Sequence, residues 1–159
     1  MSYRIGSGID FHQLQKGREL WIGGVHIPFK KGALGHSDAD VLLHAICDAL
    51  LGALALGDIG VHFPNTSEEF KNIQSILLLQ RTMDLVKQKG FSVVNIDSTI
   101  CLEEPKLNEY NSEMRKIIAG AIHVSENDVS IKATTTEEMG FIGKGKGIMA
   151  YATALLQKV

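Results

Sequence analysis

The amino-acid sequence predicts a single α+β domain, a mixed β-sheet with helices packed on one face, over residues 1–159. Segments with strand periodicity alternate with segments of helical periodicity along the chain. Apolar residues make up 45% of the 159 residues, enough for one hydrophobic core. No repeat, low-complexity tract or linker divides the sequence, so we expect one compact unit.

Each predicted element is supported by its periodicity and by the residues at its ends. Strands are predicted at 2–11, 91–102, 129–135 and 147–159, with a small N-terminal hairpin at 19–29. Helices are predicted at 40–56, 68–89 and 107–121. Ser37, three residues before Asp40, is typical of a helix start, and Gly57 and Gly90 suit the left-handed position after a helix.

Charge and composition argue against several classes of partner. The net charge of -2 provides no basic surface for nucleic acid. The longest apolar stretch is interrupted by His44 and Asp48, and the N-terminus lacks a signal-peptide apolar core, so we expect no membrane partner and a cytoplasmic location. Cys47 and Cys101 are too few for a disulfide framework and are interpreted as buried thiols.

The first chemical signal is a carboxylate and an imidazole near the N-terminus. Asp10 and His12 are one residue apart, so in a strand they project from the same face, while Ile9 and Phe11 are expected to point into the core. This spacing could form half of a metal site. The alternative is an ordinary strand end with a hydrogen-bonded histidine.

A second signal lies on the helix predicted at 40–56. Asp40, His44 and Asp48 are four residues apart and share one stripe of that helix. Such a stripe can simply face solvent, but the flanking residues are so apolar that the helix is expected to be buried, where ionisable groups need partners or a metal. Asp10, His12 and His44 would supply three ligands to a catalytic zinc ion with an open fourth position.

Two further stretches are suited to phosphate. GHSDAD, at 35–40, offers free N–H groups at a helix start, with His36 and Ser37 as donors, although Ser37 could simply cap the helix. In KATTTEEMGFIGKGKG, at 132–147, Thr hydroxyls could cradle phosphate while Glu137 holds a cation such as Mg²⁺, or the segment could merely begin a helical turn.

Asp58, in GDIGVHFPNTS, could bind sugar hydroxyls or serve only as a loop residue. The sequence contains no nucleophilic triad with local support, no Walker loop and no dinucleotide fingerprint. The expected chemistry is therefore centred on a metal and acts on phosphate.

Together, GSGIDFH, GHSDADVLLH, GDIG and IKATTTEE resemble the 2-C-methyl-D-erythritol 2,4-cyclodiphosphate synthase family of the non-mevalonate isoprenoid pathway. The resemblance extends over almost the whole chain. It implies a homotrimer with active sites between subunits, Zn²⁺ at each site and Mg²⁺ or Mn²⁺ on a diphosphate. The implied reaction converts 4-diphosphocytidyl-2-C-methyl-D-erythritol 2-phosphate to the cyclic diphosphate and CMP.

The resemblance also implies roles for individual residues. Asp10, His12 and His44 would bind zinc, Glu137 the second metal, and His36 and Thr135 would stabilise the transition state. Substrate contacts would come from Ser37, Asp58, Ile59, Gly60, Phe63, Pro64, Asn65, Thr66, Ser67, Leu102, Glu103, Glu104, Pro105, Lys106, Leu107, Asn108, Thr134, Thr136, Phe141 and Lys144. Asp40 and Asp48 are expected behind the ligands, with Asp48 orienting an imidazole.

The sequence departs from the family at two places. Asn65 and Ser67 stand where the family often has aspartates, so an acidic contact to the methylerythritol hydroxyls would become an amide contact. Lys144 and Lys146 stand where many relatives have Arg and Glu, and because lysine lacks the bidentate fork of arginine, we expect weak or absent binding of isoprenoid diphosphates.

Two other functions would use the same residues. A zinc phosphoesterase would release CMP with a linear product. A non-catalytic trimeric binding protein would use zinc only for structure, but structural sites usually have four protein ligands, and three are predicted here.

Overall fold

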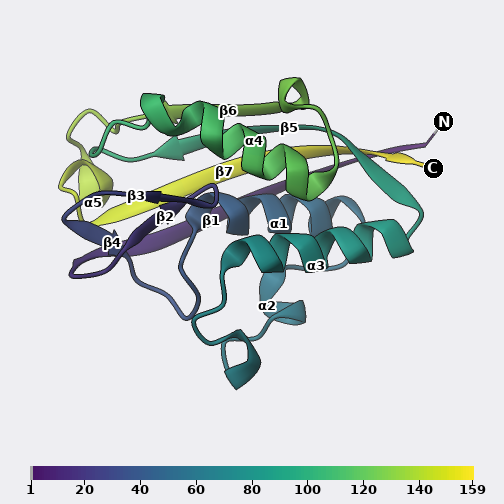
Figure 1. The fold of residues 1–159 in the computed structure, drawn as a ribbon, viewed down its shortest axis with the longest axis horizontal. Helices are drawn as coiled ribbons and strands as arrows, with labels where there is room; N and C mark the ends of the chain where they lie inside the picture. The colour runs from purple at the N-terminus through teal and green to yellow at the C-terminus, as the bar shows by residue number, and fades with distance from the viewer. Residues whose placement is uncertain (1) are drawn as a thin grey trace.

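A computed structural model describes residues 2–159 of the chain (Figure 1). The main sheet has five strands in the order β4-β1-β7-β5-β6. The strands are β1 (Tyr3–Lys16), β4 (Lys31–Ala33), β5 (Phe91–Cys101), β6 (Val129–Thr134) and β7 (Gly147–Lys158). Among the strands of residues 2–159, only β5 and β6 pair in parallel, so the sheet is mixed, as predicted.

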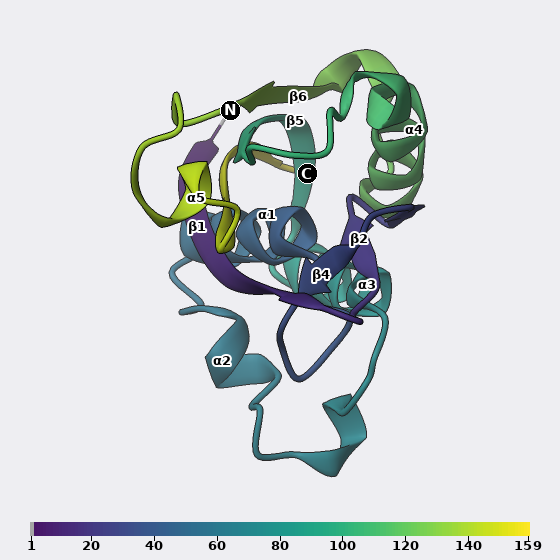
Figure 2. The same cartoon turned by 90° about the vertical axis from the view of Figure 1, so that its left-hand side faces the viewer.

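Three longer helices cover one face of the sheet, as Figures 1 and 2 show. They are α1 (Val41–Ala53), α3 (Ser75–Gln88) and α4 (Asn111–Ile122). Short helical turns occupy the connections: α2 (Ile59–His62), α5 (Gly140–Gly143), η1 (Glu68–Phe70), η2 (Asn108–Tyr110) and η3 (Glu126–Asp128). Within residues 2–159, no helix is long and apolar enough to cross a membrane.

A separate two-stranded hairpin consists of β2 (Leu20–Ile22) and β3 (Val25–Ile27). It turns at Gly23 and Gly24, which have φ of 60° and 79°, values that glycine adopts at little cost. Their N–H groups donate to the two carboxylate oxygens of Asp40, at 2.9 and 2.7 Å. The hairpin is therefore tied to the start of α1.

Several element boundaries differ from the sequence prediction. Asp40 caps α1 by accepting from the Leu43 N–H, so Ser37 is not the cap. The helix ends at Ala53, and Ala55 takes a left-handed φ of 55° before Gly57 is reached. The predicted helix at 68–89 is interrupted at 71–74, where the chain turns to pair with the segment before α1.

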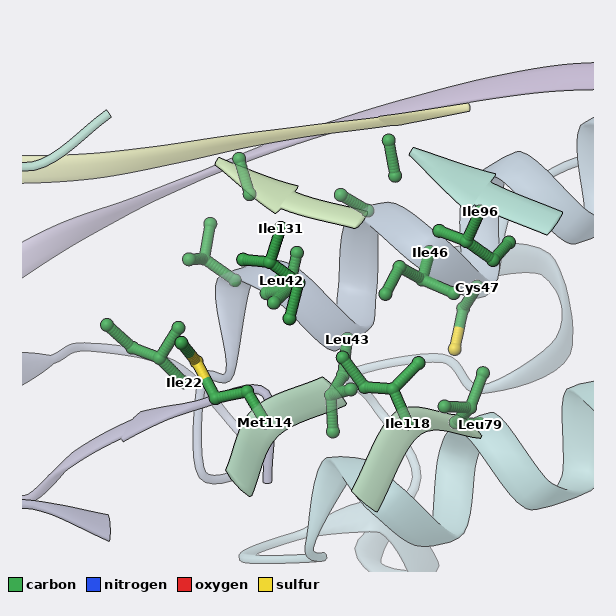
Figure 3. Close-up of a cluster of buried hydrophobic side chains, with 14 of the residues drawn as sticks. Ile22, Leu42, Leu43, Ile46, Cys47, Leu79, Ile96, Met114, Ile118 and Ile131 are labelled. Carbon is green, nitrogen blue, oxygen red and sulfur yellow. The ribbon is translucent and has the colours of Figure 1, made fainter. Parts of the chain in front are cut away.

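The hydrophobic core lies between the sheet and the three helices (Figure 3). The apolar side of α1 lies at its centre, and Leu42, Leu43, Ile46 and Cys47 are fully buried. Their labelled neighbours in the close-up come from β2, α3, β5, α4 and β6: Ile22, Leu79, Ile96, Met114, Ile118 and Ile131. Burial raises the pKa of Cys47 to about 12, so this thiol stays protonated, while Cys101 is only half buried.

The opposite face of the sheet is exposed, and its β1–β7 part carries apolar side chains. Ile5 is 72% exposed, and Ile9 and Phe11 are each 51% exposed. Tyr151, which pairs with Ile9 across β1 and β7, is also exposed on this face. The expectation that Ile9 and Phe11 point into the core is therefore wrong. The face of β1 that packs on α1 is the one that carries Asp10 and His12.

Close approach between β1 and α1 explains this choice of face. A Cβ at Gly6 would lie 2.1 Å from the carbonyl oxygen of Ala49, and one at Gly8 would lie 2.0 Å from that of Ala45. These glycines let the helix backbone rest directly on the strand. Beside them, the buried face of β7 carries small side chains at Ala150, Ala152 and Ala154.

Replacing Gly8 with alanine should lower the free energy of unfolding by about 3 kcal/mol, since the new Cβ meets helix backbone that cannot rotate away. Gly120, on the exposed side of α4, has no atom within 4 Å of its ideal Cβ. As a matched control, Gly120→Ala should stabilise the protein by up to about 1 kcal/mol. Urea unfolding curves of the two variants measure both effects. Equal effects would contradict the close-packing argument.

Candidate active site

Three ligand atoms from β1 and α1 converge on one point. The carboxylate oxygen Oδ2 of Asp10 lies 2.8 Å from Nε2 of His12 and 3.0 Å from Nδ1 of His44. The two nitrogens are 3.2 Å apart. One carboxylate oxygen and two imidazole nitrogens in this arrangement are suited to hold a divalent metal ion.

Both imidazoles are held by partners on their other nitrogen. Nδ1 of His12 donates to the carbonyl oxygen of Leu34 at 2.9 Å. Because a carbonyl can only accept, Nδ1 carries a proton, and in the neutral imidazole the lone pair of Nε2 faces the cluster. Nε2 of His44 lies 2.8 Å from Oγ of Ser75, which leaves Nδ1 facing the cluster. Neither Leu34 nor Ser75 was indicated by sequence spacing.

Charge at the cluster reflects the same geometry. Burial works against ionisation of Asp10, but hydrogen bonds from His12 and His44 outweigh it and hold the pKa of Asp10 at about 2. Burial likewise works against protonation of His12, but the Asp10 carboxylate raises the pKa of His12 above its ordinary value. A divalent cation at the cluster would displace the proton from Nε2 of His12. The positive charge beside the Asp10 carboxylate would then be that of the metal.

The two aspartates predicted behind the ligands have other partners. Asp40 is fully buried and accepts from three backbone N–H groups, those of Gly23, Gly24 and Leu43. Asp48 accepts from the N–H of Ile59 at 2.8 Å, which anchors the loop after α1. The prediction that Asp48 orients an imidazole is corrected: Ser75 is the partner of His44 Nε2.

A small cavity adjoins His44. It has a volume of about 110 Å³ and is lined by His36, Ser37, His44, Ile59, Gly60, Phe63, Asn65, Phe70, Ile73 and Leu78. His36 donates from Nε2 to the carbonyl oxygen of Ser67 at 3.2 Å. The hydroxyl of Ser37 is buried, accepts from the N–H of Ala39 and lies 3.2 Å from Nε2 of His44. Its hydroxyl therefore lies behind the imidazole.

A second cluster joins the loop after β5 to the loop after β6. The carboxylate of Glu103 accepts from the N–H groups of Thr136 and Glu138, at 3.2 and 2.9 Å. The hydroxyl of Thr135 accepts from the N–H of Glu137, and Glu137 and Glu138 have left-handed φ, 52° and 63°. Glu103 thus shapes the loop that carries Thr135 and Glu137.

The remaining predicted site residues divide by exposure. Buried members are Ser37, Phe63, Leu102 and Leu107, the last two within the main core. Half-buried members are His36, Ile59, Pro64, Ser67, Glu103, Pro105, Thr135 and Thr136. Exposed members are Asp58, Gly60, Asn65, Thr66, Glu104, Lys106, Asn108, Thr134, Glu137, Phe141 and Lys144.

The fold and this cluster define a metal-binding α+β protein with polar loops around the metal position. A family model described as the YgbB family matches residues 3–157. The chain belongs to this family.

Curated relatives share more than half of their residues with the chain. A protein of Bacteroides thetaiotaomicron is 54% identical over 158 residues, 99% of each chain, and is named 2-C-methyl-D-erythritol 2,4-cyclodiphosphate synthase. A protein of Bacillus pumilus with the same name is 57% identical over 155 residues, 98% of each chain.

Solved structures share the fold. "IspF (Plasmodium falciparum) CDP complex" is 32% identical with a TM-score of 0.87, covering 99% of this chain and 97% of that one. The bifunctional IspDF from Campylobacter jejuni is 39% identical with a TM-score of 0.95. The match covers 99% of this chain and 43% of the bifunctional chain.

Zinc binding should weaken as the pH is lowered from about 8 to about 6, the range in which histidines titrate. Zinc affinity falls at low pH because the pKa of His12 is raised: below that pKa, the metal must displace a proton from Nε2 of His12. With one proton displaced, the apparent dissociation constant should rise by about tenfold per pH unit. Competition with a chromophoric chelator measures it.

The control is His26→Asn, which removes a histidine exposed on the hairpin next to Trp21. This variant should show the same pH dependence as the unmodified protein. Zinc affinity that is constant over the same range would contradict the proton competition.

Proposed function

We propose that the chain catalyses the reaction for which its relatives are named, formation of 2-C-methyl-D-erythritol 2,4-cyclodiphosphate in the non-mevalonate isoprenoid pathway. The substrate is 4-diphosphocytidyl-2-C-methyl-D-erythritol 2-phosphate, and the other product is CMP. The observation that carries this proposal is the Asp10, His12 and His44 cluster in a chain that matches the family over residues 3–157.

The reaction is an intramolecular phosphoryl transfer. An oxygen of the 2-phosphate attacks the β-phosphorus, a new P–O–P bond closes the ring, and CMP leaves with the electron pair of the broken bond. The attacking phosphate is already an anion, so no side chain has to deprotonate it. The main barrier is to bring two mutually repelling phosphates into line, which positioning and positive charge lower.

Zinc at the cluster would supply positive charge that draws phosphate oxygens together. The chain's own groups act around it. The imidazole of His36, which lines the adjoining cavity, and the hydroxyl of Thr135 stabilise charge on the transferred group. Glu137, exposed on its loop, would hold a second divalent cation such as Mg²⁺ or Mn²⁺, which would supply positive charge to the diphosphate.

The nucleotide is bound by two loops. Asp58 and Gly60, at the start of α2, bind the ribose, and residues 102–108 line the cytosine pocket. The related Plasmodium falciparum structure is a CDP complex, which supports a cytidine nucleotide as ligand. Within 102–108 the side chains of Leu102 and Leu107 are buried in the core, so contacts to cytosine come from the backbone and from the other side chains.

The active sites lie between the subunits of a homotrimer. Within residues 2–159, the hydrogen bonds of the metal cluster and its cavity are separate from those of the Glu103 cluster, which supports a site assembled from two chains. The uncovered sheet face with Ile5, Ile9 and Phe11 supports association of subunits. The enzyme acts in the cytoplasm on this small molecule.

Assembly is tested by placing a charge on the apolar sheet face. Ile9→Glu should shift the protein from trimer to monomer in analytical ultracentrifugation, because the carboxylate would lose its hydration in the interface. Leu77→Glu, at a 42% exposed leucine on α3, is the matched control and should remain trimeric. A trimer that tolerates Ile9→Glu would exclude this face from the interface.

Phosphorus NMR of the protein with substrate, Zn²⁺ and Mg²⁺ tests the reaction. We expect the two coupled signals of a cyclic diphosphate together with CMP, and no product after EDTA treatment. His12→Ala should reduce turnover at least about 100-fold, since it removes a metal ligand.

The rival functions give other spectra. CMP with a linear phosphate would indicate a zinc phosphoesterase. Absence of turnover by a protein that binds zinc would favour a binding protein.

A further inference from the structure

The buried nitrogen of His44 lies at the end of a short polar chain. Oγ of Ser75 is 2.8 Å from Nε2 of His44, and Oγ of Ser37 is 3.2 Å away. His44 is only 6% exposed and Ser75 is fully buried. Solvent therefore does not supply the partner of this nitrogen.

Asp38 holds Ser75 at two atoms. Its Oδ2 accepts from the backbone N–H of Ser75 at 3.0 Å, and its Oδ1 accepts from the Ser75 hydroxyl. Since the hydroxyl has one proton and donates it to Asp38, Oγ is left to accept from Nε2 of His44. The direction of the whole chain, from imidazole to hydroxyl to carboxylate, is thereby determined.

The position of the proton on His44 matters because a second acceptor competes for it. Nδ1 lies 3.0 Å from Oδ2 of Asp10. A proton on Nδ1 would satisfy that carboxylate, but it would occupy the lone pair that a metal needs. A proton on Nε2 leaves the lone pair free. The partners of Nε2 therefore influence whether the cluster is ready for a metal.

We propose that Asp38 and Ser75 are positioning residues that keep the proton of His44 on Nε2, so that Nδ1 is held as a metal ligand. The proposal rests on the metal site of the proposed function. Ser75 begins α3 and Asp38 lies in the segment before α1, so docking of α3 against that segment also sets the state of the metal site. Ser37 assists at a longer distance while accepting from Ala39.

The test is Ser75→Ala, which removes the hydroxyl but retains the N–H that donates to Asp38 and therefore the start of α3. We expect about 10- to 100-fold weaker Zn²⁺ binding, the usual effect of losing such a partner. Isothermal titration with Zn²⁺ measures this loss. ¹⁵N NMR of the imidazoles in zinc-free protein should show the His44 proton moving from Nε2 toward Nδ1, a change that general destabilisation would not cause.

Ser98→Ala is the matched control. Ser98 is also a buried serine, 1% exposed, whose hydroxyl donates to the Ser130 carbonyl oxygen at 2.9 Å in the sheet. The Ser98→Ala variant should be less stable than the unmodified protein but should show no change in zinc affinity or in the His44 tautomer. Asp38→Asn, which weakens the hold on the Ser75 hydroxyl, should change both quantities in the direction of Ser75→Ala and serves if Ser75→Ala does not fold.

The outcomes separate this inference from the function on which it rests. If the unmodified protein binds no zinc, the proposed metal site is wrong. If it binds zinc, and Ser75→Ala or Asp38→Asn matches Ser98→Ala in affinity and tautomer, the positioning role is overturned.

Discussion

The direct contact of α1 with β1 is the constraint on which the rest of the structure depends. Gly6 and Gly8 leave no room for a side chain between strand and helix, so the two backbones meet. The same contact places Nδ1 of His44 on the helix 3.0 Å from the Asp10 carboxylate on the strand. The apolar side of α1 is then directed at the core. The close approach of α1 to β1 therefore determines both the packing of the core and the positions of the candidate metal ligands.

The fold gives each of the fully or partly buried aspartates of this region a hydrogen-bond partner. Asp40 accepts three backbone N–H groups and so joins the hairpin to α1. Asp48 accepts one from Ile59 and ties down the next loop. A buried carboxylate without such partners would lose its hydration and gain no hydrogen bonds in exchange, which would strongly destabilise the folded state. These aspartates therefore build the scaffold, while Asp10 is left for the cluster.

The loop held by Glu103 and the metal cluster are two separate polar groups, an arrangement that suits a site completed by another subunit. Glu103 holds the loop that carries Thr135 and Glu137, and its hydrogen bonds are separate from the metal cluster. The apolar part of the sheet that includes Ile9 and Phe11 lies on the face opposite α1. A sheet covered on one face only leaves the other to water or to association. This arrangement connects the trimer and the chemistry of the proposed function.

Sequence patterns by themselves determined most of the elements, the mixed α+β class and the three candidate metal ligands, because periodicity and residue chemistry act locally. Tertiary structure decided which face of β1 is covered, since alternation at Ile9, Asp10, Phe11 and His12 fits either side and only the glycines opposite α1 distinguish them. It also decided the partners of the ligands. Ser75 lies 31 residues from His44, and Asp38 reaches it only because the turn at 71–74 brings α3 beside the start of α1. Contacts between distant segments depend on how the chain packs, which spacing along the sequence does not encode.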